Sequence, residues 1–121
     1  MQNRAAKIIT GATRYDSSTA ALNALKWYTL KDRYNFHLAT TMYKIMNDHA
    51  PNYLVNRFNV KYSGYDLRGF KNLSIPKPNT DFKKRSISYC GATIWNSLPT
   101  DVKSKCNVST FKKYYKICNN V

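Results

Sequence analysis

Apolar residues recur at helical spacing through the first half of this chain, most clearly between residues 30 and 48. Thr29 followed by Asp32 resembles a capping box, with Asp in place of the usual Glu. Pro51 prevents a helix from continuing past residue 50. The pattern predicts a helix of about five turns over 30–48. Its apolar positions are Leu30, Tyr34, Leu38, Met42 and Ile45.

Shorter helices are predicted wherever an apolar period lies between a start and a stop signal. Gly11 is a stop, a hydroxyl among residues 17–19 is an N-cap, and Pro51 suits a first helical position. Leu98-Pro99 is a second stop, and Ser109 is a second cap. The predicted ranges are 3–11, 18–25, 52–57, 91–97 and 109–118.

No helical period survives between residues 60 and 88, where glycines and prolines interrupt the chain. Short extended pieces are predicted around 66–68, 73–75 and 86–89, the last because polar and apolar residues alternate there. The predicted fold class is therefore mostly α: a small helical domain with an irregular basic segment that has room for a short β-hairpin. An N-terminal helical part, 1–59, would join a second part, 60–121, in one domain.

The predicted core combines the inward positions of these helices. We expect Trp95 in the core rather than in a binding site, because its helix is short and otherwise apolar. The other predicted core residues are Ile8, Leu22, Leu25, Trp27, Leu30, Leu38, Met42, Ile45, Leu54, Ile94, Leu98 and Phe111.

Composition adds a strong charge imbalance to this picture. The 121 residues include 20 Lys and Arg against 6 acids, all Asp, for a formal net charge of +14. Such an excess repels itself in a compact state, so we expect a polyanionic partner, with RNA or DNA first. The alternatives are a solvated basic surface that maintains solubility and, less well supported, a membrane surface.

Two groups of residues are the candidate nucleic-acid contacts. In both, cations would neutralise phosphates, and in the first, aromatic rings would stack on unpaired bases. The alternatives are rings that pin an irregular loop to the core and a helix face that is merely solvated. The first group is Tyr65, Arg68, Lys71, Phe82, Lys83, Lys84 and Arg85, and the second is Lys112, Lys113 and Lys116.

Other chemistries find little support. Three cysteines without a tight pair indicate reduced thiols, an intracellular location in nucleus or cytoplasm, and no zinc site. No glycine-rich phosphate loop or adjacent Asp pair is present, so we expect neither an enzyme nor a small-molecule substrate, and no cofactor. No apolar run is long enough for a membrane span, and no signal peptide is expected.

Six sequence blocks, in order and over nearly the whole chain, carry a family resemblance. They are residues 2–11 (QNRAAKIITG), 25–30 (LKWYTL), 42–54 (MYKIMNDHAPNYL), 65–68 (YDLR), 86–99 (SISYCGATIWNSLP) and 109–113 (STFKK). In these blocks the chain resembles the C-terminal region of reverse transcriptases from non-LTR retrotransposons of the jockey/chicken-repeat kind. Cys90 departs from the family, which often has Arg or Ser there.

The resemblance implies the non-catalytic tail of an RNA-directed DNA polymerase, whose fingers, palm and thumb would lie upstream as partners. Such a tail would hold template RNA or target DNA. Met1 aligns with an internal position of the family, which implies a fragment of a degraded element. The alternatives are a module that braces the polymerase thumb through protein contacts and a relic without function. RNA and DNA remain equal candidates, because their distinction depends on contacts to the 2′-hydroxyl.

Overall fold

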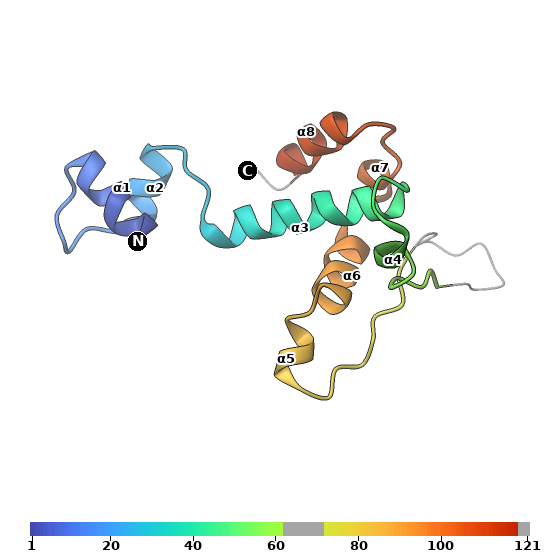
Figure 1. Ribbon diagram of the computed structural model, residues 1–121. Helices are drawn as coiled ribbons and strands as arrows, with labels where there is room; N and C mark the ends of the chain where they lie inside the picture. The colour runs from blue at the N-terminus through green and yellow to red at the C-terminus, as the bar shows by residue number, and fades with distance from the viewer. Residues whose placement is uncertain (62–71, 119–121) are drawn as a thin grey trace. The chain divides into compact units, whose positions relative to one another are not determined.

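A computed structural model describes residues 1–61 and 72–118 of the chain (Figure 1). Within these ranges it contains eight helices, and its only β-pairing is an isolated antiparallel bridge between Val60 and Leu73. The prediction of a mostly α fold is therefore confirmed. The chain forms two compact units, Met1–Tyr34 and Asn35–Val121, which are described in turn as unit 1 and unit 2. The predicted division at residue 59 rests on composition and stays a prediction.

Unit 1 is a pair of short helices, α1 (Gln2–Thr10) and α2 (Ser18–Ala24). Gly11 ends α1 in the left-handed conformation, with φ at 66°, which glycine adopts without a steric cost. The buried contact between the helices consists of small side chains, with Leu25 packed against them. Its members are Ala6, Ala21 and Leu22.

Unit 2 is organised around α3 (Leu30–Met46), most of which belongs to it. Thr29 caps α3 as predicted: its hydroxyl accepts from the amide of Asp32 and donates to the Asp32 carboxylate. In Figure 1, α3 runs between α8 and α6. The other helices of unit 2 are α4 (Asn52–Val55), α5 (Asp81–Lys84), α6 (Ile87–Ser97), α7 (Thr100–Lys103) and α8 (Val108–Cys118).

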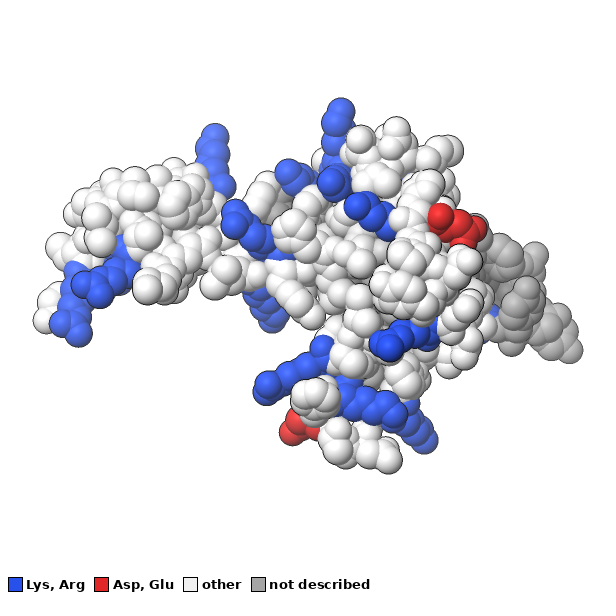
Figure 2. All heavy atoms as spheres, viewed as in Figure 1, with Lys and Arg blue, Asp and Glu red and all other residues white. Residues whose placement is uncertain are grey.

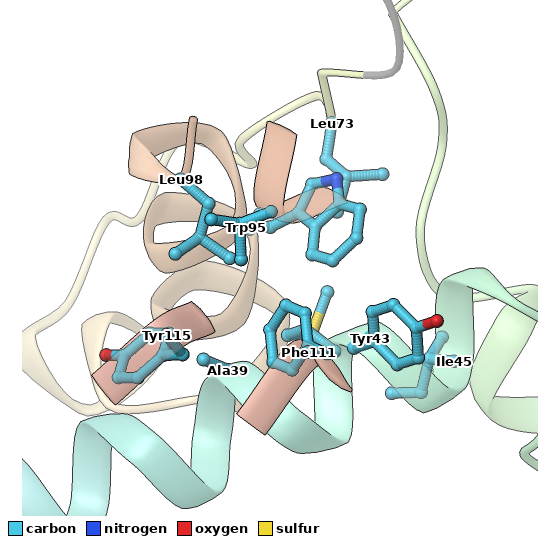
Figure 3. Close-up of a cluster of buried hydrophobic side chains, with 11 residues drawn as sticks. Ala39, Tyr43, Ile45, Leu73, Trp95, Leu98, Phe111 and Tyr115 are labelled. Carbon is cyan, nitrogen blue, oxygen red and sulfur yellow. The ribbon is translucent and has the colours of Figure 1, made fainter. Parts of the chain in front are cut away.

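The core of unit 2 is aromatic. Figure 3 shows Phe111 of α8 next to both Tyr43 of α3 and Trp95 of α6. The Phe111 and Tyr43 rings stack with centroids 4.4 Å apart, and Trp95 is only 2% exposed. The Tyr43 hydroxyl donates to the carbonyl of Lys105, which satisfies the one polar atom of that buried side chain.

Gly91 lets α6 approach α3 closely. A Cβ at this position would lie 2.5 Å from Sδ of the fully buried Met42. Leu98 and Val102 close the core at the end of α6 and in α7.

The helix predictions were confirmed except at some ends, and two single-turn helices, α5 and α7, were missed. The predicted strand at 86–89 is wrong, because these residues begin α6. A four-residue alternation is too short to separate a strand from the first helical turn. Around 73–75 the chain lies outside any helix, with the Val60–Leu73 bridge as its only ladder contact among described residues. The extended piece predicted at 66–68 lies outside the described residues.

Three predicted core residues are exposed instead: Ile8 at 72%, Leu30 at 67% and Trp27 at 41%. Ile8 is exposed because unit 1 buries the face of α1 that carries Ala6. Trp27 lies between α2 and α3, outside any helix, and Leu30 is the first residue of α3. Leu25, Leu54 and Ile94 are half-buried. The remaining predicted core residues are buried, namely Leu22, Leu38, Met42, Ile45, Trp95, Leu98 and Phe111.

Candidate nucleic-acid interface

A tight corner between α5 and α6 presents the strongest candidate residues. Thr80 caps α5 by accepting the Lys83 amide at 3.3 Å, and the helix ends after one turn at Arg85. The Ser86 hydroxyl then donates to the Lys83 carbonyl at 2.7 Å, where α6 begins. These local hydrogen bonds fix a turn from which four consecutive side chains project. We call Phe82, Lys83, Lys84 and Arg85 the basic corner.

All four side chains of the basic corner are exposed, and Phe82 is 88% exposed. Figure 2 shows Lys and Arg side chains gathered over the segment that Figure 1 labels α5. Lys84 forms an ion pair with Asp81 at 2.8 Å. No acid in the described part of the chain lies within ion-pair distance of Lys83 or Arg85. The Phe82 ring is therefore exposed to solvent next to Lys83 and Arg85, neither of which has an acid partner among the described residues.

The three lysines of the second predicted group, on α8, have different surroundings. Lys112 and Lys113 are exposed, whereas the Lys116 ammonium lies 5.5 Å from the ring centroid of Phe36. A cation over a ring face is stabilised by the ring quadrupole, so Lys116 also has a structural role. Lys105, which precedes α8, makes a closer contact of this kind with Tyr114, at 4.0 Å.

Tyr65, Arg68 and Lys71 lie outside the described residues. The chain on both sides of them is held by backbone hydrogen bonds: the Lys61 amide donates to Asn72, and the Ser74 amide donates to Asn59, each at 2.8 Å.

Asn96 of α6 fastens the same segment to α6 at Leu73. Its side-chain amide accepts from the Leu73 amide at 2.8 Å and donates to the Leu73 carbonyl at 2.9 Å. Sequence reasoning missed this clamp. Asn has a low helix propensity because its side chain competes with the backbone for hydrogen bonds, so Asn96 is unusual inside a helix, but the sequence does not identify its partner.

Lys103 supports the clamp and was also missed. Its ammonium donates to the Asn72 side chain at 3.1 Å and lies 5.7 Å from the ring centroid of Trp95. Burial lowers the pKa of Lys103 from its usual value. This lysine therefore belongs to the packing of unit 2 rather than to a phosphate-binding face.

The thiols do not gather at one place. Cys90 is half-buried and its Sγ donates to the Lys84 carbonyl at 2.8 Å, while Cys106 and Cys118 are exposed. Across residues 1–61 and 72–118, no cluster of three or more His, Cys, Asp or Glu side chains could hold a metal ion. Within the same ranges, no helix has the length and apolarity that a membrane crossing requires.

Comparison with known proteins adds no relative. No protein-family model, curated protein or solved structure significantly matches this chain.

Proposed function

We propose that this chain is a non-catalytic nucleic-acid-binding module, similar to the tail of a non-LTR retrotransposon reverse transcriptase. It binds template RNA or target DNA through phosphates. The observation that carries the proposal is the basic corner, where an exposed ring stands beside cations without an acid partner.

The corner would act by two contacts that differ in kind. Lys83 and Arg85 neutralise neighbouring phosphates, which releases counterions and makes affinity depend steeply on salt. Phe82 stacks on an unpaired base, a contact worth about 1–3 kcal/mol that tolerates any base. Single strands are therefore preferred to duplexes.

The test is binding of the full chain to labelled single-stranded RNA and to duplex DNA across a salt series. Lys83→Gln/Arg85→Gln should reduce the slope of log K against log salt by about two, because two phosphate contacts are lost. Phe82→Ala should weaken single-strand binding by about tenfold and leave the salt slope unchanged. The matched control is Lys44→Gln/Arg57→Gln, which removes two exposed cations of unit 2 outside the corner.

An equal loss in the control and corner variants would contradict the proposal, since binding would then follow net charge alone. So would absence of binding at 50 mM salt by a cooperatively folded chain. That second result would favour a packing module that braces upstream polymerase domains through protein contacts. A specific observation supports this second candidate: unit 1 leaves Ile8 and Ile9 of α1 exposed, at 72% and 60%.

A further inference from the structure

Unit 1 contains a hollow of about 590 Å³ between α1, the following loop and the start of α2. Three cations, Arg4, Lys7 and Arg14, line it together with polar side chains that include Thr13 and Ser18. No acid is among the lining residues. The volume lies in the range of about 300–1,000 Å³ that small-molecule sites usually occupy.

Local geometry brings the three cations together. Arg4 and Lys7 are three residues apart on α1, so their side chains leave the same face of the helix. The left-handed Gly11 then reverses the chain and returns Arg14 toward Lys7. The Lys7 ammonium donates to the Arg14 carbonyl at 2.9 Å, which holds the loop against the helix.

One acid, Asp16, is hydrogen-bonded to a residue that lines the hollow. The Asp16 carboxylate accepts from the Thr13 amide at 2.6 Å and from the Thr13 hydroxyl at 2.9 Å. Its charge offsets part of the charge of Lys7. Neither Arg4 nor Arg14 lies within ion-pair distance of an acid in the described part of the chain.

The chemistry of the lining fits a phosphate ester. Two guanidinium groups supply paired N–H donors that match phosphate oxygens, and the Ser18 hydroxyl on α2 supplies an O–H donor. Ile8, which is 72% exposed, forms an apolar part of the wall. An inorganic anion would leave that wall without a partner, whereas a sugar or base could pack on it.

We propose that this hollow is a nucleotide-phosphate site, with the phosphate on Arg4 and Arg14 and the attached sugar or base on Ile8. The inference rests on the proposed function for the identity of its ligand, a nucleic-acid strand, and adds a second contact in unit 1. A free nucleotide carries the same chemistry, so the test separates the two sources.

The experiment is an NMR titration of the full ¹⁵N-labelled chain with 5′-AMP and, separately, with a twelve-nucleotide single-stranded RNA. Amide shifts at Arg4, Lys7, Thr13 and Arg14 report on the hollow. We expect Arg4→Gln/Arg14→Gln to weaken RNA binding at these amides by about tenfold. The matched control is Lys31→Gln/Arg33→Gln, which removes two exposed cations of unit 1 away from the hollow. This control should change RNA binding at the same amides by less than threefold.

Shifts with RNA but not with 5′-AMP would identify the strand as the ligand, and shifts with both would extend the site to free nucleotides. No shift in the hollow with either probe would overturn the inference. Equal losses in the two variants would also overturn it. Because the amides of the basic corner are followed in the same spectra, failure of the hollow alone is distinguishable from failure of the proposed function.

Discussion

The two units of this protein are built from similar helices but are stabilised very differently. Unit 1 buries three small or medium side chains, Ala6, Ala21 and Leu22, whereas the core of unit 2 includes Trp95, Tyr43 and Phe111. Stabilisation scales with buried apolar area, at about 25 cal/mol per Å². Unit 2 therefore has the core of an independent domain. Unit 1, which ends at Tyr34, is shorter than the roughly 40 residues below which extra stabilisation is usually needed.

Both units leave large apolar side chains in water. Ile8 and Ile9 of unit 1 are exposed, as are Phe82 and Ile117 of unit 2. An aliphatic face in a weakly stabilised unit favours a partner or ligand that completes it, because binding to the folded form adds to its stability.

Matched core truncations should show the largest effect. Trp95→Ala should destabilise unit 2 by about 3–5 kcal/mol, because it leaves a large cavity in the aromatic core. Leu22→Ala should cost at least about 2 kcal/mol and melt unit 1 altogether, since little else holds its helices. Amide hydrogen exchange, followed residue by residue, measures both. If either change unfolded the two units together, their separation would be wrong.

The two described glycines should respond to alanine for different reasons, each at a cost of about 1 kcal/mol. Gly11 has open space around it, so Gly11→Ala is penalised only by the positive φ. Gly91→Ala is penalised by contact with Met42, which outweighs the gain in helix propensity. Denaturant unfolding should show Gly91→Ala neutral or stabilising in a Met42→Ala background, with Gly11→Ala unchanged. An identical response of both would contradict this explanation.

The smallest expected effect is a pH dependence of unit 1. Hydrogen bonds from the Thr13 side chain and amide, with a contribution from Lys7, lower the pKa of Asp16 below its usual 3.8. Since the folded pKa is the lower one, this stabilisation is present above the unfolded pKa and is lost as the pH falls through the folded value. Exchange protection of the Thr13 amide should therefore decrease below about pH 4. In Asp16→Asn the decrease should disappear, and a decrease that persisted would assign it to another group.

Much of the fold could be predicted from local signals. The Thr29 cap, the period of α3 and the stop after Ser97 are properties of neighbouring residues, and they gave α3 to within two residues and the end of α6. The core residues that unit 2 takes from α3 were predicted from the same helical period. The clamp between Asn96 and Leu73 could not be predicted, because it joins residues 23 positions apart.

The candidate sites divide in the same way. The exposed basic corner is a run of consecutive residues, and its charge is visible in the sequence. The sequence does not show that Lys116 differs from Lys112 and Lys113, because the Phe36 ring that Lys116 contacts belongs to α3, far away in the sequence. The hollow of unit 1 was also hidden, because Arg4 and Arg14 lie on opposite sides of a turn.

The sequence by itself determined the helical class, the strong positive charge and several of the places where helices begin or end, because these depend on composition and on neighbours within a turn. Tertiary structure alone decided which apolar faces are buried. Ile8 and Leu38 were both predicted at inward positions of their helices, yet only Leu38 is buried. The reason is that burial requires a partner surface from elsewhere in the chain. Leu38 lies on the buried side of α3, whereas the buried face of α1 is the one that carries Ala6.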